Sequence, residues 1–108
     1  MSLYELTGKH VGVGFDLGTT NSVVGVFMDG KATILNSSQH SKSTTPSVVF
    51  FGKYGVVVGE EALEKKRLSQ NIIMESKRLM GNSYLDIQKF LSNWNFTVLN
   101  EDSKLFFV

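Results

Sequence analysis

The chain has 108 residues and a formal net charge of +1, and its hydrophobic fraction of 42% is ordinary for a globular protein. This length suits one small domain or part of a larger one. The near-neutral charge gives no basic excess that would attract nucleic acid or an anionic membrane. The absence of cysteine excludes disulfides, thiolate zinc sites and a cysteine nucleophile.

Residues 1–10 are polar and lack the apolar core of a signal peptide, so they are interpreted as a leader. We therefore expect the domain to occupy residues 11–108. No apolar run approaches the length of a membrane-spanning helix. These features predict a soluble protein of the cytoplasm.

The first part of the domain has the pattern of short strands. Asp29 and Gly30 are a strong hairpin signal, because a type I′ turn needs positive φ at both of its central positions. A polar loop is expected over residues 36–45, and Pro46 ends it. The apolar stretches before this loop predict strands over residues 11–16, 22–28 and 31–35.

A second pair of strands is expected over residues 47–51 and 56–58, around a glycine-containing turn. Glu60 and Glu61 follow directly. Acidic residues suit the first turn of a helix because of the helix dipole, so a helix is predicted over residues 60–68.

Two more helices are predicted, one over residues 72–80 that Gly81 stops, and one over residues 84–93. Strands over residues 96–99 and 105–108 complete a mixed α+β chain of the α/β class. The spacing of apolar residues gives the last helix one apolar face, formed by Tyr84, Ile87, Leu91 and Trp94.

The turn after the first strand has the residues that phosphate recognition requires. Gly18 has no Cβ, so the backbone there can turn sharply and approach an oxyanion. The N–H groups of Thr19, Thr20 and Asn21 could form an anion-binding concavity, and the two hydroxyls could add hydrogen bonds to phosphate oxygens. Asp16 stands at the strand end, where it could hold magnesium directly or through water.

Other interpretations of this segment stay open. The turn could belong to a plain hairpin, and Gly14 and Gly25 could allow close strand packing with no ligand involved. The segment is not a Walker loop, which leads into a helix and carries a lysine. It is not a dinucleotide fingerprint either, since the third glycine is misplaced.

The segment Gly14-Phe15-Asp16-Leu17-Gly18-Thr19-Thr20-Asn21-Ser22 resembles the first phosphate motif of the 70-kDa heat-shock chaperones, a motif shared loosely with actin and sugar kinases. Further matches to the chaperone family fall in order and at suitable spacing between residues 11 and 99. They are Thr44-Thr45-Pro46-Ser47-Val48-Val49, Gly59-Glu60-Glu61-Ala62, Asn71, Ser76-Lys77-Arg78-Leu79-Met80-Gly81, Trp94, Phe96 and Val98.

The resemblance implies part of an RNase H-like, actin-like ATPase domain, its first lobe only. ATP or ADP with magnesium would be the cofactor. The full-length protein would use hydrolysis to clamp and release unfolded peptides, together with J-domain co-chaperones and nucleotide exchange factors. Neither nucleic acid nor a membrane is expected as a partner.

The resemblance also implies the roles of individual residues. Asp16 would hold the water shell of magnesium, and Lys77 would orient the attacking water and stabilise charge on the γ-phosphate; these two are the expected catalytic residues. The residues themselves support Lys77 only modestly, because it shares a predicted helix stripe with Ile73 and Met80, an apolar edge where lysine usually reaches solvent. The expected nucleotide-binding residues are Gly18, Thr19, Thr20, Asn21 and Lys77.

The chain departs from the family pattern in three ways. Ser43 replaces the arginine that usually precedes the Thr-Thr-Pro sequence, and Asn95 replaces the proline after the tryptophan. The chain is also several times shorter than the family's ATPase domain. Three hypotheses therefore compete: the N-terminal piece of a chaperone ATPase, a truncated paralogue that acts as a non-catalytic binding module, and a sugar kinase, which the downstream motifs disfavour. The unpaired strands of such a piece predict self-association.

Overall fold

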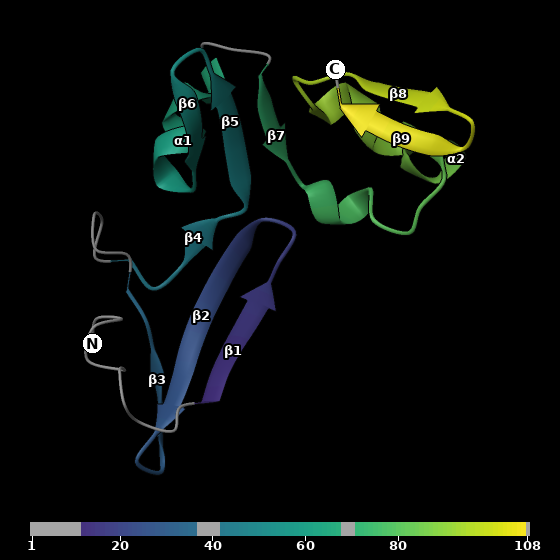
Figure 1. Cartoon of the computed structure of the whole chain (residues 1–108). Coiled ribbons are helices and arrows are strands. Elements are labelled where there is room, and N and C mark those ends of the chain that lie inside the picture. The colour runs from purple at the N-terminus through teal and green to yellow at the C-terminus, as the bar shows by residue number, and fades with distance from the viewer. Residues whose placement is uncertain (1–11, 37–41, 68–70, 108) are drawn as a thin grey trace.

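Three antiparallel β-sheets and several short helices make up residues 12–36, 42–67 and 71–107, the part of the chain that the computed structural model describes (Figure 1). The mixed α+β class predicted from the sequence is confirmed. The predicted leader and Val11 lie outside the described residues. None of the helices that the structure describes has both the length and the apolar character needed to cross a membrane.

The first sheet, sheet A, contains the predicted hairpin. Asp29 and Gly30 have φ values of 53° and 76°, the positive values that a type I′ turn needs, so the predicted turn is confirmed. The register pairs Gly14 with Gly25 and Asp16 with Val23. The strands are β1 (Gly12–Leu17), β2 (Asn21–Met28) and β3 (Lys31–Ile34), and the short β4 (Thr45–Pro46) pairs with the beginning of β2.

The second sheet, sheet B, has β5 at its centre with a partner on each side. Its strands are β5 (Val48–Gly52), β6 (Gly55–Val58) and β7 (Ile72–Met74). The helix predicted after β6 is confirmed for its described part, although only its beginning is α-helical and its last turn is 3₁₀. It consists of α1 (Glu60–Glu64) and η2 (Lys65–Arg67).

The helix predicted over residues 72–80 is wrong. Ile72 and Ile73 lie in β7 and pair with β5, and only Ser76–Arg78 is helical, as the 3₁₀ turn η3. β-branched side chains fit a pleated sheet well, and one edge of β5 is open to a further strand. The segment therefore pairs with β5 as a strand instead of forming a helix. The helical stripe predicted for Ile73, Lys77 and Met80 therefore does not exist.

The C-terminal part begins with the predicted last helix, which is confirmed as α2 (Tyr84–Ile87) followed by the 3₁₀ helix η4 (Gln88–Asn93). Ser83 caps it by accepting a hydrogen bond from the backbone of Asp86, whose carboxylate accepts one from the backbone of Ser83. Sheet C follows as a hairpin of β8 (Val98–Glu101) and β9 (Lys104–Phe107).

The core lies among sheet B, α1, α2 and the segment that leads into sheet C. The predicted apolar face of the last helix is confirmed, since Ile87 and Trp94 are buried in this core. Sheet A adds none of its described residues to the cluster. The cluster consists of Val48, Ala62, Ile72, Met74, Ile87, Trp94, Phe96 and Val98.

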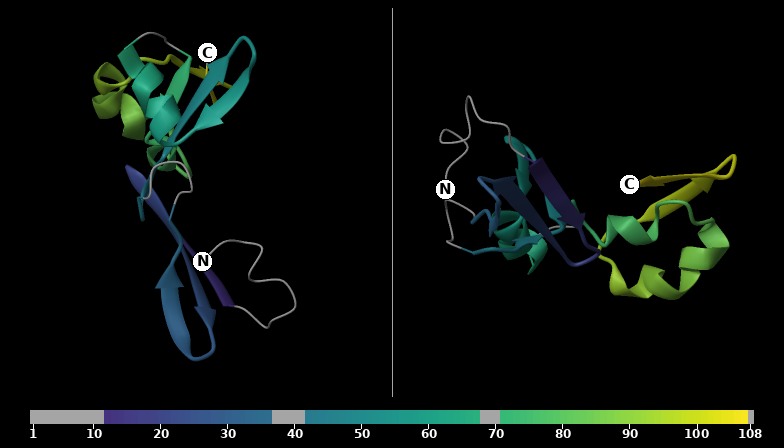
Figure 2. Two further views of the ribbon diagram at one scale, coloured as in Figure 1. Left: turned by 90° about the vertical axis from the view of Figure 1, so that its left-hand side faces the viewer. Right: turned by 90° about the horizontal axis from the view of Figure 1, so that it is seen from below.

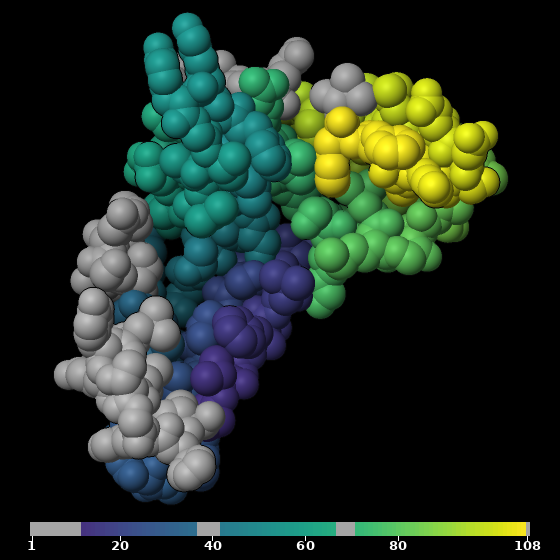
Figure 3. All heavy atoms as spheres, in the orientation of Figure 1, coloured from purple at the N-terminus to yellow at the C-terminus, as the bar shows by residue number. Residues whose placement is uncertain are grey.

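Sheet A projects from this core as an arm (Figures 1 and 2). The radius of gyration is 16.9 Å, whereas a compact chain of this length would have about 13 Å. The space-filling view shows the arm below the blocks that carry sheets B and C (Figure 3). Large apolar side chains of the arm are therefore in solvent: Val13, Phe15, Leu17, Phe27 and Ile34.

We expect the chain to self-associate in solution. The outer edge of β1 has no strand partner among the described residues, and Phe15 beside it is 75% exposed. Free strand edges and exposed apolar faces recruit further chains. Light scattering should show a mass that rises with concentration towards a dimer or larger species, and Phe15→Lys should reduce this rise.

A matched substitution on a still more exposed aromatic side chain away from sheet A, Tyr54→Lys, should leave the association unchanged. A compact monomer of constant mass over the whole concentration range, with a cooperative thermal transition, would show the expectation to be wrong.

Candidate functional site

The turn between β1 and β2 consists of Gly18, Thr19 and Thr20, and it is folded tightly upon itself. A Cβ placed on Gly18 would collide with the backbone carbonyl oxygen of Asn21. That oxygen belongs to the main chain, so it cannot move aside as a flexible side chain would. Only glycine fits this position, which gives a physical reason for the residue that the sequence analysis singled out.

Ser47, which lies between β4 and β5, holds the turn from one side. Its hydroxyl donates to the carbonyl oxygen of Gly18 at 2.8 Å, and its backbone N–H donates to that of Thr20 at 2.9 Å. Because Ser47 uses its only hydroxyl proton on Gly18, the 2.8 Å contact between the hydroxyls of Ser22 and Ser47 has Ser22 as the donor.

These bonds determine where the amides of the turn point. In a trans peptide the C=O and N–H groups point in opposite directions, and no described peptide bond is cis. The N–H groups of Thr19 and Asn21 therefore point away from Ser47, since the carbonyls of Gly18 and Thr20 point towards it. These two N–H groups could donate to an anion on that side of the turn.

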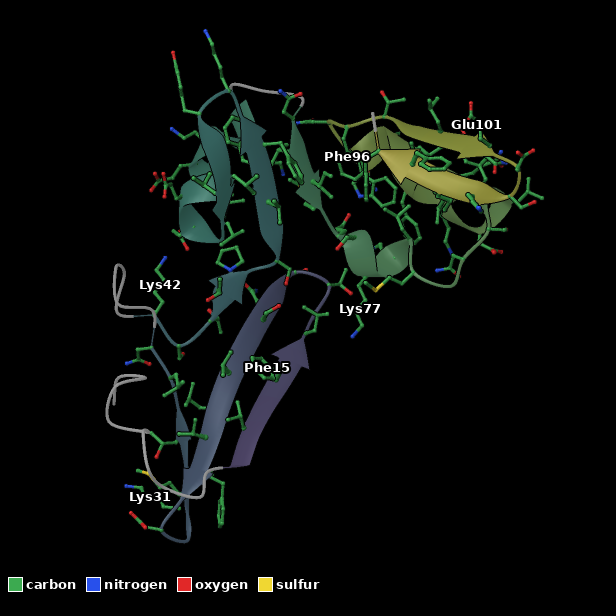
Figure 4. The ribbon with its side chains drawn as sticks, in the orientation of Figure 1. Phe15, Lys31, Lys42, Lys77, Phe96 and Glu101 are labelled. Carbon is green, nitrogen blue, oxygen red and sulfur yellow. The ribbon has the colours of Figure 1, made fainter. Side chains whose placement is uncertain are left out.

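Lys77 lies beside this turn. Its Nζ donates to the carbonyl oxygen of Leu17 at 2.9 Å, although sixty residues separate the two in sequence. Figure 4 shows Lys77 reaching from η3 towards the end of the β1–β2 hairpin. The structure thus brings the predicted lysine next to the predicted turn, on an exposed surface that a ligand can approach.

Asp16 is exposed near the end of β1, two residues before Gly18. Successive side chains of a strand point to opposite faces, so Asp16 faces away from the side that carries Phe15 and Leu17. Its backbone is adjacent to the Leu17 carbonyl that accepts from Lys77. The two predicted catalytic residues therefore flank the same short stretch of main chain.

A cleft of about 310 Å³ lies behind the turn. Thr19, Thr20 and Asn21 line it together with Ser47, whereas Asp16, Gly18 and Lys77 do not. The residues predicted to contact nucleotide are consequently divided between two sides of the turn. The other residues that line the cleft are Pro46, Val48, Leu63, Lys66, Met74, Glu75 and Asn93.

Glu75 forms a polar cluster that the sequence analysis did not identify. Its carboxylate accepts a hydrogen bond from Nε1 of Trp94 at 2.6 Å and pairs with Nε of Arg78 at 3.2 Å. The Trp94 hydrogen bond, aided by Arg78 and the charge of Lys66, lowers the pKa of Glu75 against the opposing effect of burial. Nothing in the spacing of these residues indicates the contact, because Trp94 is nineteen positions away.

Comparison with known proteins identifies a family. The family model described as "Hsp70 protein" matches residues 12–108. The chain is 38% identical over 99 residues to a human protein named putative heat shock 70 kDa protein 7, which covers 89% of this chain and 27% of that protein.

Two further relatives are a bacterial and a microsporidian protein. A chaperone protein HscA homolog from Shewanella frigidimarina is 47% identical over 77 residues, covering 70% of this chain and 12% of that protein. A mitochondrial-type heat shock protein 70 from Encephalitozoon cuniculi is 41% identical over 91 residues, covering 82% of this chain and 15% of that protein. The chain thus spans between 12% and 27% of the length of these three relatives.

Replacement of Gly18 by alanine should destabilise the chain, because the new methyl group must displace the main chain at Asn21. We expect a loss of about 2 kcal/mol in the free energy of unfolding, typical of steric and backbone strain at a special position. Gly14→Ala is the matched control, since a Cβ there meets nothing within 4 Å. Urea titrations at one protein concentration would measure the free energy of unfolding of both variants. Equal losses for the two substitutions would contradict the expectation.

Trp94 is the single tryptophan and should report the protonation of Glu75. A pKa lowered by folding means that ionised Glu75 stabilises the folded state above its unfolded pKa, and that this stabilisation is lost as pH falls through the folded pKa. The emission of Trp94 should therefore titrate with a midpoint below about 4.3, the ordinary value for glutamate. Glu75→Gln should abolish this titration, and its persistence in that variant would assign it to another group.

Proposed function

Because the chain belongs to the Hsp70 family, we propose that the turn between β1 and β2 binds the β- and γ-phosphates of ATP as the first part of a chaperone ATPase site. The described fold is a mixed α+β part of the first lobe of an actin-like ATPase domain. The observation that carries the proposal is the contact of Lys77 with the Leu17 carbonyl, directly before a turn that accepts no side chain at Gly18.

The residues present suit a polyphosphate with its metal. Gly18 leaves the main chain bare where an oxyanion would approach, and the N–H groups of Thr19 and Asn21 point away from the Ser47 tether. The hydroxyls of Thr19 and Thr20 are the proposed partners of the β- and γ-phosphate oxygens. Bound magnesium would neutralise charge on those oxygens, and Asp16 is the proposed residue that holds its water shell.

Lys77 has a separate proposed role. An ammonium group held beside the turn can stabilise charge that develops on the γ-phosphate and orient the attacking water. The hydrogen bond to Leu17 limits the freedom of a long side chain before nucleotide arrives, so less entropy is lost when the ammonium engages phosphate. The same bond restricts the ammonium to the neighbourhood of Gly18.

The proposal for the whole protein goes further. Hydrolysis would drive the clamping and release of unfolded peptides, with J-domain co-chaperones and nucleotide exchange factors as partners and the cytoplasm as the compartment. The family match makes a sugar kinase the weaker hypothesis. A non-catalytic binding module would share the turn but would not hydrolyse ATP, so the experiment below separates it from an ATPase.

A chimera tests the proposal: the HscA homolog from Shewanella frigidimarina carrying residues 12–108 of this chain, the range of the family match, in place of the corresponding segment of its own. It should hydrolyse ATP, and Asp16→Asn and Lys77→Ala should each lower kcat about a hundredfold while leaving KM for ATP nearly unchanged, because both groups act on the transferring phosphate. Lys31→Ala is the control, since that lysine lies at the opposite end of sheet A (Figure 4).

Two outcomes would contradict the proposal. Unchanged kcat with raised KM in both variants would assign Asp16 and Lys77 to ground-state binding, and an inactive chimera that still binds ATP would favour the non-catalytic module.

Residues 1–108 alone should bind magnesium and ATP more weakly than micromolar and show no turnover above their Lys77→Ala variant. Phosphoryl transfer requires several elements around the γ-phosphate, and these residues supply one side of it.

A further inference from the structure

Glu75 has an unusual backbone conformation. Its φ of 53° and ψ of 27° place it in the left-handed region, which costs energy for a residue with a Cβ. The other described non-glycine residues with positive φ are Asp29, Asp102 and Ser103, and all three lie in two-residue hairpin turns. Glu75 is instead the single residue between β7 and η3, where the main chain changes direction.

Two side chains from different elements hold Glu75 in this conformation. Trp94, at the end of η4, donates to one carboxylate oxygen, and Arg78, from η3 itself, pairs with the other. The guanidinium of Arg78 also lies 4.4 Å over the ring of Phe90, which stacks against Trp94 at 6.2 Å. A strained residue persists when its surroundings restrain it in this way, and such restraint points to a function.

The sheet register places Glu75 next to the tether of the turn. Val48 of β5 pairs with Met74 of β7, and the two strands are antiparallel. Ser47, which precedes Val48, and Glu75, which follows Met74, therefore leave sheet B side by side. Both residues line the cleft behind the turn, together with Thr19 and Thr20.

The change of direction at Glu75 determines where Lys77 lies. The backbone of Arg78 donates to the carbonyl of Glu75 at 2.9 Å, which closes the single turn of η3 around Lys77. From that turn the side chain of Lys77 reaches the Leu17 carbonyl. An extended conformation at residue 75 would continue the line of β7 and carry η3 away from the β1–β2 hairpin.

We propose that Glu75 is a positioning residue for Lys77, with the bond from Trp94 and the pair with Arg78 fixing the turn that places the lysine ammonium on the phosphate-binding hairpin. This inference rests on the proposed function, in which Lys77 acts on the γ-phosphate. It adds that the hydrogen bond from Trp94, in a segment distant in sequence from the hairpin turn, sets the position of that lysine.

The test is the rate at which Lys77 of the 108-residue chain reacts with a trace amount of an amine-acylating reagent, followed by mass spectrometry without nucleotide. An ammonium held on a carbonyl must leave it before it can react. Glu75→Gly removes the carboxylate while allowing the left-handed backbone, and it should raise the rate at Lys77 about fivefold, the effect of losing one typical hydrogen bond. Glu75→Gln keeps an acceptor for Trp94 and should give a smaller rise.

Trp94→Phe approaches the same contact from the other side, because it retains the stacked ring and removes the N–H donor. It should also raise the rate at Lys77. Lys42, paired with Glu60 at 3.1 Å, is the internal control for the folded state, and Glu101→Gln is the control for loss of one carboxylate charge. A rise confined to Lys77 in the Glu75 and Trp94 variants supports the proposal.

The proposal that Glu75 positions Lys77 would be overturned by an unchanged acylation rate at Lys77 in the Glu75 and Trp94 variants. It would also be overturned if the acylation rate at Lys42 rose equally in these variants. Because the acylation experiment contains no nucleotide, its failure is distinct from failure of the chimera. If the acylation rate at Lys77 rises in these variants but Lys77→Ala leaves the kcat of the chimera unchanged, Glu75 positions Lys77 and the proposed catalytic role of Lys77 is wrong.

Discussion

The two hydrogen bonds from Ser47 to the carbonyls of Gly18 and Thr20 connect the two parts of this molecule. Sheet A contributes none of its described residues to the core, so its position cannot be determined by core packing. The short pairing of β4 with β2 and the bonds of Ser47 hold the arm instead, with Lys77 on the opposite side of the same hairpin end. The candidate site is therefore also the joint of the structure.

This arrangement explains why the turn needs a strict local geometry. Gly18 must fold back towards Asn21 without a side chain, because its carbonyl has to face Ser47 while the following amide faces outward. A serine suits the other side of the joint, since its hydroxyl and backbone N–H act on two carbonyls at once. Steric and hydrogen-bonding requirements meet in residues that the sequence motif already contains.

Local features of the chain could be predicted from the sequence, and features that depend on distant partners could not. The β1–β2–β3 hairpins, the helix start at Glu60 and the apolar face through Ile87 and Trp94 follow from periodicity and turn chemistry, and the structure confirms them. The segment Ile72–Met74 is too short for its periodicity to separate helix from strand, and the free edge of β5 decides.

The candidate site shows the same division. The composition of the turn indicated phosphate recognition, and the family resemblance pointed to Lys77, whose predicted helix proved to be a strand and a 3₁₀ turn. Neither Ser47 as a tether nor the bond between Glu75 and Trp94 was predicted, because these contacts join residues nineteen or more positions apart. Such contacts exist only once the sheets have assembled.

The peptide groups of the turn have a consequence for how the two parts of the molecule influence each other. The Gly18–Thr19 and Thr20–Asn21 peptide groups each present a C=O to Ser47 and an N–H to the other side, so each would be polarised between two hydrogen bonds if an anion bound there, as proposed. Negative charge on one side of the peptide group increases the electron density on the carbonyl oxygen and strengthens the bond on the other. By linkage, an anion that strengthens the bonds of Ser47, as the proposed phosphate would, is itself held more tightly when those bonds are made.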